Sequence, residues 1–331
     1  MTADISRGIP DSLTFKHHRV DFARVVQRYY ANGPAELRMT SLGAWTRGAD
    51  MWTGTEYATR VPGRRVVLYQ AAPKVYYQQT FLPQASPNSD NDLTQLIASG
   101  RYPLAGQSHT VTFARGPVGP GVEKTYRWVV RHDNRLQGFL PLFDGAGSAM
   151  FGFVDGQDGH WSLRRGQRVL AAGRHFIQLN ARVPAATRSY VLRAASHPAA
   201  HNWQLSTSVR DVWGFRTGEG RPAVPLLTPS YLPPLSMSGF APRGATSFRL
   251  AFHTLAHVDR RIARASLELS TDNGRTWTPA RLTRTGPTTF RVQYDNPGAR
   301  GTSRFMSMRV TGADASGDSV REVALRVYRL R

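Results

Sequence analysis

One short segment gathers polar side chains that can bind one another. Residues 270–277 read Ser-Thr-Asp-Asn-Gly-Arg-Thr-Trp. Asp272 can accept hydrogen bonds from turn amides, Asn273-Gly274 can adopt positive φ, and Trp277 can fold back over the turn. These are folding tasks. The segment therefore predicts a structural hairpin clamp built on Asp272, Gly274 and Trp277, with no catalytic role.

The same segment matches the Asp-box pattern Ser-x-Asp-x-Gly-x-Thr-Trp, and so resembles the turns of sialidase-type propeller blades. In propellers this box recurs from blade to blade. A single copy stands in this chain. The sequence therefore disfavours a sialidase propeller.

A candidate nucleophile lies in Gly301-Thr302-Ser303, which is similar to the Gly-Thr-Ser of subtilisin-like peptidases. The subtilase serine opens a buried helix, whereas Ser303 precedes an alternating, strand-like pattern. Neither His-Gly-Thr nor Asp-Thr/Ser-Gly occurs in the chain. Because a serine hydroxyl without a histidine base is a poor nucleophile, we expect no catalytic site and no enzyme activity.

Three histidine pairs are candidate metal ligands: His17-His18, His197 with His201, and His253 with His257. The i, i+4 spacing of His197 and His201 suits a helix, but Pro198 interrupts it and the zincin glutamate is absent. Solvated or structural histidines are favoured.

Two acidic patches contain the Asp and Gly residues that calcium sites use. They are Asp144-Gly145 with Asp155, Asp158 and Gly159, and the segment Asp314 to Asp318. Their spacing does not match a calcium loop, and ordinary turn residues are favoured. The chain also contains no cysteine, which excludes disulfides and thiolate metal sites. We expect no metal and no cofactor.

The charge balance is strongly basic. The chain of 331 residues has 43 Lys and Arg against 22 Asp and Glu, a net charge of +21. Such a surplus attracts polyanions. The arginines are spread over all segments, however, and do not form a dense run, which disfavours a specific nucleic-acid role. An acidic cell-wall polymer or an acidic polypeptide is the alternative partner.

No stretch approaches the roughly 20 apolar residues that span a bilayer, so no membrane span is expected. Residues 1–10 lack the charged and apolar regions of a secretory signal. Taken as complete, the sequence predicts a cytoplasmic protein.

Short alternating segments dominate the chain and predict an all-β fold. One helix is expected at Asp21 to Tyr30, where Phe22, Val25, Val26 and Tyr29 recur at helical spacing. The clearest strands are residues 64–70, 109–114, 125–131, 175–181, 189–194, 247–254, 265–270, 276–280, 289–294, 305–313 and 320–329. Alternation predicts that Met306, Met308 and Val310 point inward.

The length exceeds what one hydrophobic core supports. We expect two or three Ig-like or fibronectin-like sandwich modules in tandem, with Trp213 sealing the end of the middle one. The predicted division is a β-rich module with a short helix at 1–95, a middle sandwich at 96–217, a link of six prolines at 218–242, and an Ig-like sandwich at 243–331.

Residues 212–331 are similar to the C-terminal part of large secreted subtilisin-like serine peptidases of actinobacteria. The resemblance rests on an ordered series: Val212 to Thr217, Val224 to Leu227, a Pro-rich link, the hairpin Leu267 to Trp277, Met308 to Asp314 and Val327 to Leu330. Residues 135–193 match more weakly. The resemblance implies a non-catalytic region, an extracellular location, and a protease domain encoded upstream in a split or truncated gene.

Two functions follow as hypotheses. The first is an accessory region of such a peptidase that provides support, substrate engagement or surface attachment. The alternative is a carbohydrate or cell-wall binding module, because five aromatic residues are expected to be exposed beside the basic surface: Trp45, Trp52, Tyr76, Tyr77 and Trp161. A hydrolase with an unrecognised site is a third reading, which assays on casein and sialosides would separate from the first two.

Overall fold

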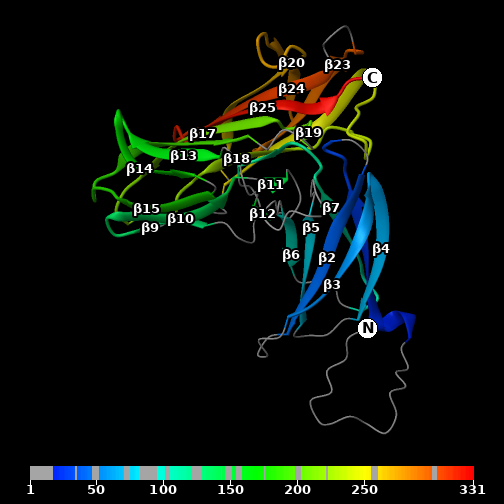
Figure 1. The fold of residues 1–331 in the computed structure, drawn as a ribbon. Coiled ribbons are helices and arrows are strands. Elements are labelled where there is room, and N and C mark those ends of the chain that lie inside the picture. Colours follow the sequence, from blue (N-terminus) through cyan, green and yellow to red (C-terminus); the bar gives the residue numbers. More distant parts are fainter. Residues whose placement is uncertain are drawn as a thin grey trace.

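The computed structural model is almost entirely β (Figure 1), which confirms the predicted fold class. The first strands, β1 to β7, form an arm that extends from a body built by the later strands. The structure describes residues 18–33, 36–46, 52–70, 75–82, 95–100, 105–120, 128–142, 144–145, 151–153, 159–174, 176–197, 203–220, 223–254, 260–299 and 304–331.

The arm contains two sheets. The first has the order β4-β1-β7, with β1 antiparallel to β4 and parallel to β7. The second has the order β12-β6-β5-β2-β3. The bounds are β1 (Phe22–Tyr29), β2 (Glu36–Thr46), β3 (Trp52–Val61), β4 (Gly63–Gln70), β5 (Val75–Leu82), β6 (Gln95–Gly100), β7 (Ser108–Phe113) and β12 (Phe151–Phe153).

The helix predicted at Asp21 to Tyr30 is wrong. A 3-10 turn, η1 (Arg19–Asp21), leads into β1 instead. This strand is central in its sheet and buries residues on both faces, including Val25, Val26 and Tyr29. A strand that is buried on both faces loses the period of two, so its apolar residues imitated helical spacing.

Two small sheets accompany the body, in the orders β15-β10-β9 and β11-β8, and the first lies beside β13 and β14 at the end away from the arm (Figure 1). Their strands are β8 (Val118–Gly119), β9 (Trp128–His132), β10 (Arg135–Pro141), β11 (Asp144–Gly145) and β15 (Phe176–Arg182).

The body is organised around one large sheet with the order β14-β13-β16-β17-β25-β24-β20-β21. Its central pair, β17 and β25, runs antiparallel from Ser208↔Leu325 to Gly214↔Ser319. The segments expected as separate modules at 96–217 and 243–331 therefore share one sheet. The bounds are β13 (His160–Arg165), β14 (Arg168–Arg174), β16 (Arg188–Ser196), β17 (Ser208–Thr217), β20 (Ile262–Ser270), β21 (Thr278–Pro279), β24 (Phe305–Asp314) and β25 (Ser319–Arg329).

A smaller sheet, β18-β19-β23-β22, packs against one face of the large sheet. Phe252 of the small sheet lies so close to Gly312 of the large one that a Cβ on the glycine would meet its ring. Met306, Met308 and Val310 are buried, as predicted. The bounds are β18 (Leu227–Tyr231), β19 (Gly244–Thr254), β22 (Arg281–Arg284) and β23 (Thr289–Asn296).

The proline-rich stretch at 218–242 is more than a connection. It contributes β18, an edge strand, and buries Val224, Leu226 and Tyr231. Pro229 lies within this strand, where an edge position tolerates the missing amide donor. How many modules the chain contains stays a prediction.

Candidate functional site

The Asp-box segment forms the turn after β20. Asp272 accepts hydrogen bonds from the amides of Arg275 and Thr276 (both 3.0 Å), and from the Thr276 hydroxyl (2.6 Å). Asn273 and Gly274 have φ of 57° and 86°. The indole of Trp277 donates to the Gly274 carbonyl (3.0 Å). The carboxylate and the indole are thus both engaged within the turn.

These bonds stabilise the ionised form of Asp272. The Thr276 hydroxyl and amide, followed by the Ser270 hydroxyl, hold the pKa of the Asp272 carboxyl well below its ordinary value. A carboxylate that is fully ionised and already hydrogen-bonded makes a poor general acid or base. The geometry favours a structural role for this turn.

Trp213 lies in the middle of the large sheet. It pairs with Leu192 of β16 and Val320 of β25, and its side chain is 2% exposed. It therefore packs where the middle and C-terminal segments meet, inside the sheet they share.

Three exposed arginines follow one another across neighbouring strands on the outer face of the large sheet: Arg193 in β16, Arg210 in β17 and Arg321 in β25. We call this set the arginine face. Val212 pairs with both Arg193 and Arg321, while Arg210 lies two residues away along β17. The three residues therefore zigzag across the sheet as diagonal neighbours, about 7–8 Å apart.

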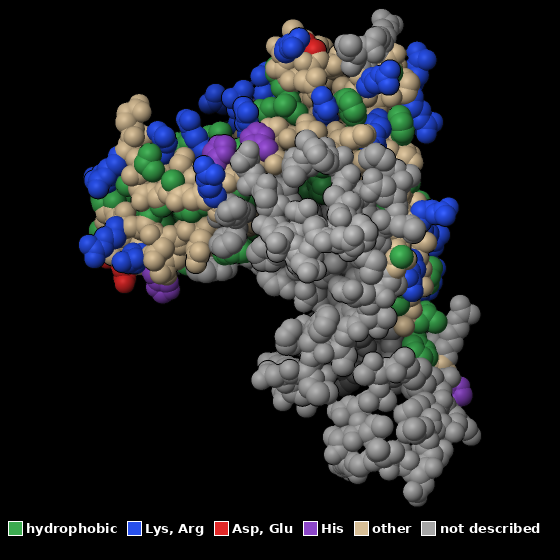
Figure 2. Space-filling view, in the orientation of Figure 1, with side chains coloured by type: hydrophobic (Ala, Val, Ile, Leu, Met, Phe, Trp, Pro, Cys, Tyr) green, Lys and Arg blue, Asp and Glu red, His purple; other side chains and the backbone are tan. Residues whose placement is uncertain are grey.

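The arginine face has no ion pair of its own, although Arg321 lies close enough to Glu268 for its charge to help lower the pKa of that carboxyl. None of its three guanidinium groups forms an ion pair or side-chain hydrogen bond with a residue in the described part of the chain. Arg309 of β24 extends the series but is already bound to Glu268 through two hydrogen bonds (both 2.5 Å). Figure 2 shows Lys and Arg side chains gathered over the body, with acidic ones sparse on the visible face.

Two carboxylic acids lie under the arginine face, on the inner side of the same strands. Asp211 of β17 and Glu322 of β25 occupy directly opposed positions and are 1% and 6% exposed. We call them the carboxyl pair. The Tyr231 hydroxyl donates to Glu322 Oε1 (2.5 Å), whereas neither carboxylate oxygen of Asp211 has a hydrogen-bond partner among the described residues.

Burial dominates the electrostatics of this pair. Loss of water raises the pKa of Asp211 well above its ordinary value, and the neighbouring Glu322 raises it further. Burial also raises the pKa of Glu322 to about 7, against the opposing effect of the Tyr231 hydrogen bond. The carboxyl pair thus holds protons at pH values where most carboxyls are ionised.

The acidic turn at Asp314 to Asp318 is closed by an arginine. Arg260 Nη1 lies 2.7 Å from Asp318 Oδ2 and 3.4 Å from Asp314 Oδ2. Asp314 also accepts the Asp318 amide (3.0 Å), and Asp318 accepts the Arg216 amide (2.9 Å). Both carboxylates of the turn are therefore already paired with the Arg260 cation.

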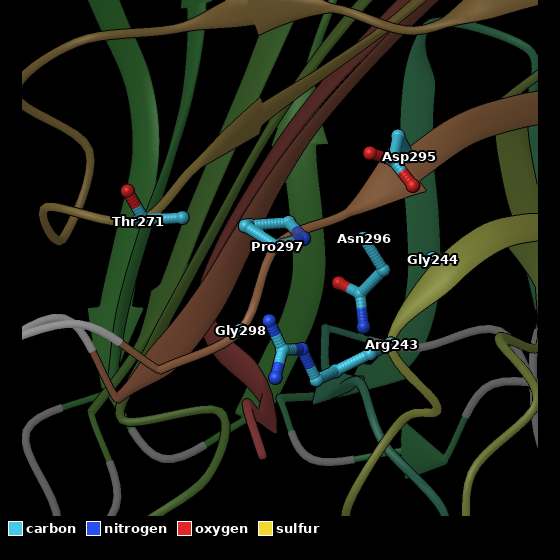
Figure 3. Close-up of a pocket in the computed structure, with 7 residues that line it drawn as sticks. All are labelled: Arg243, Gly244, Thr271, Asp295, Asn296, Pro297 and Gly298. Carbon is cyan, nitrogen blue, oxygen red and sulfur yellow. The ribbon is translucent and has the colours of Figure 1, made fainter.

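A hollow of about 630 Å³ opens beside the Asp-box turn (Figure 3). The Arg243 guanidinium lies next to Gly298 in its lining. Asn296 is used by the fold, since it donates to the Pro242 carbonyl (2.5 Å) and accepts the Tyr328 hydroxyl (2.8 Å). One cation, Arg243, and one anion, Asp295, remain in the lining, so the hollow favours neither charge.

Several sequence candidates lie outside the described residues: Ser303, His17, His201, His257, Asp155 and Asp158. His253 lies exposed on β19. In the described ranges no group of three or more His, Asp or Glu is placed to hold a metal, and no helix there is long and apolar enough to cross a membrane. Trp161, expected to be exposed, is buried at 5%.

Sequence reasoning missed the arginine face and the carboxyl pair. The local signal is the repeated order Arg-acid-Val, at Arg210-Asp211-Val212 and Arg321-Glu322-Val323. In a strand that order sends Arg and Val to one side and the acid to the other. The pairing of these two triplets requires the register between strands that lie far apart in the sequence.

No protein-family model matches the chain. A search of the curated proteins likewise finds no match.

Proposed function

We propose that this protein is a non-catalytic accessory region that attaches to a linear acidic polymer through the arginine face. The polymer would carry spaced carboxylate or phosphate groups, as acidic cell-wall polymers do. The observation that carries the proposal is the series of three unpaired arginines on three neighbouring strands.

Unpaired like charges at diagonal positions repel one another, so folding alone does not favour them. A guanidinium binds carboxylate and phosphate oxygens in a two-pronged geometry, and an anion that bridges neighbouring arginines would relieve the repulsion. The repeat across the strands suits a chain of anions that lies over the sheet.

The surroundings favour a polymer over a peptide or a nucleic acid. The strands β16, β17 and β25 have paired neighbours on both sides, so they offer no free backbone edge to an extended peptide. Valines lie between the arginines, where a single-strand binder would present aromatic side chains for base stacking.

Binding of the full chain to immobilised polymers tests the proposal. We would compare a polycarboxylate, a poly(glycerol phosphate), neutral dextran and duplex DNA at low and high salt. The two acidic polymers should retain the protein more strongly than dextran or DNA, and salt should weaken this binding steeply. Equal retention on dextran, or preference for DNA, contradicts the proposal.

A triple variant locates the site. Arg193→Gln, Arg210→Gln and Arg321→Gln together should weaken binding at least about tenfold, because three ionic contacts are lost. A matched control combines Arg168→Gln, Arg249→Gln and Arg291→Gln, which are exposed arginines outside the arginine face and give the same net charge. Equal losses in the two triples would show that net charge alone is responsible.

The resemblance to the C-terminal regions of subtilisin-like peptidases supports an accessory role beside a protease domain encoded upstream, and an extracellular location. Peptidase assays on casein test the non-catalytic part. Turnover by the purified chain that an active-site serine probe abolishes would overturn it.

A carbohydrate-binding module is a second candidate. The strand register places Trp45 of β2 opposite both Trp52 of β3 and Tyr76 of β5. Sites that bind neutral sugars are often rich in aromatic residues, so this group of three on neighbouring strands is compatible with such a site. Retention on neutral cell-wall glycans that Trp45→Ala abolishes, with binding to acidic polymers unchanged, would favour this candidate.

A further inference from the structure

The arginine face and the carboxyl pair share their strands. Asp211 lies between Arg210 and Val212, and Glu322 lies between Arg321 and Val323. Because side chains alternate along a strand, the two acids project inward beneath the arginines that project outward. Burial agrees, since Arg210 and Arg321 are exposed while Asp211 and Glu322 are buried. The arginine face and the carboxyl pair therefore lie on opposite faces of the same sheet.

We infer that the proton occupancy of the carboxyl pair sets how strongly the arginine face holds an acidic polymer. The protonated pair leaves the face fully positive. Ionisation places a negative charge beneath the arginines and weakens their attraction for the polymer. This inference rests on the proposed function and adds its regulation.

Among the described residues, no cation contributes to the pKa of either acid. Opposite Asp211 in β16 is Ala194, and opposite Glu322 in β24 is Val310. The strand β18 contributes the Tyr231 hydroxyl, and β8 packs Gly119 against Val209 of β17. Along its strand each acid directly follows an exposed arginine that projects from the opposite face, Arg210 before Asp211 and Arg321 before Glu322. The arginine face is therefore where a change in the pair's charge acts.

The direction with pH follows from Glu322. Burial raises its pKa to about 7, and Asp211 titrates higher than an ordinary aspartate. Glu322 therefore loses most of its proton between pH 6 and pH 8. Interior charges are weakly screened, so polymer affinity should fall about three- to tenfold over that interval and be highest at the acidic end.

Linkage makes the effect reciprocal. If protonation strengthens polymer binding by a given factor, saturating polymer must strengthen proton binding at Glu322 by the same factor. A three- to tenfold coupling corresponds to a rise of about half a unit to one unit in the pKa of Glu322. This second readout does not depend on any variant.

The experiment measures binding of the full chain to dextran sulfate at pH 6, 7 and 8, because sulfate groups keep their charge over this range. The wild type should bind three- to tenfold more weakly at pH 8. Glu322→Gln, which keeps an oxygen for the Tyr231 hydroxyl, should bind at pH 8 as tightly as at pH 6. His160→Gln is the control, because His160 lies two residues from Ser162, which pairs with Arg193, and an imidazole can also gain charge in acid.

The outcomes separate the two proposals. Polymer binding at one affinity from pH 6 to pH 8 overturns the coupling and leaves the proposed function standing, whereas no retention at any pH overturns both. Loss of the pH dependence in His160→Gln, or its survival in a folded Glu322→Gln, also overturns the coupling. If Glu322→Gln does not fold, carbon NMR titration of the wild-type carboxyls decides, and a Glu322 pKa unchanged by saturating polymer overturns the inference.

Discussion

The guanidinium of Arg309 lies 4.6 Å from the centre of the Trp277 ring. Arg309 belongs to β24 and also binds Glu268 of β20, while Trp277 closes the turn after β20. The cation thus ties the Asp-box turn to the neighbouring strand of the large sheet. The turn is fastened to the body, beyond its own internal hydrogen bonds.

We expect Asp272→Ala to destabilise the protein more than Asp295→Ala, which removes the same charge from an exposed position. The first change leaves two turn amides and two hydroxyls without their acceptor. The depressed pKa of Asp272 means that its contribution is complete at neutral pH and is lost only in strong acid. Urea unfolding at pH 7 checks the order, and equal midpoints would contradict it.

The contact between Arg309 and Trp277 should appear as a coupling energy. In a double-mutant cycle with Arg309→Gln and Trp277→Leu, we expect about 0.5–1 kcal/mol, the range of a partly exposed cation–π contact. Unfolding of the four proteins in urea provides the measurement. If the stability losses of the two single variants simply add up in the double variant, Arg309 stabilises the protein through Glu268 and not through Trp277.

Sequence reasoning succeeded where a strand has one buried face. In β24 the alternation predicted that Met306, Met308 and Val310 point inward, and all three are buried. It failed at β1, because a central strand with both faces buried has no alternation to read. Alternation of apolar and polar residues therefore indicates a strand with one buried face, and it is absent from strands that are buried on both faces.

The candidate site depended on information that local pattern does not contain. Asp211 and Glu322 lie 111 positions apart, and the pairing of β17 with β25 brings them together. Alternation predicts which side of its strand each residue faces. It does not predict which strands are neighbours, so the carboxyl pair and the arginine face emerge only from the fold.

Stability should fall as pH rises from about 5 to 8 because of Glu322. Its folded pKa of about 7 exceeds the ordinary glutamate value, so the folded state binds the proton more tightly than the unfolded one. The stabilisation is complete below the unfolded pKa and is lost as pH rises through the folded pKa, by up to about 3 kcal/mol. Urea unfolding at several pH values measures this slope.

Glu322→Gln provides the comparison for that slope. A neutral amide cannot ionise, so the variant should show a flatter pH profile and exceed the wild type in stability at pH 8. Asp295→Asn, at an exposed carboxyl, should keep the wild-type profile. An unchanged slope in Glu322→Gln would place its origin elsewhere in the chain.

Packing of the small sheet against the large one should depend on Gly312. A Cβ at this position would overlap Cε1 of the Phe252 ring and lie 2.7 Å from its Cδ1. Both residues are buried, so the ring has little room to move, and we expect Gly312→Ala to lose about 1–3 kcal/mol. Gly214→Ala is the matched control in the same sheet, because its Cβ would meet only the Ser319 hydroxyl (2.8 Å), which can rotate away. Thermal and urea unfolding of both variants test the difference. If Gly312→Ala is no less stable than Gly214→Ala, the two sheets do not pack as closely as described.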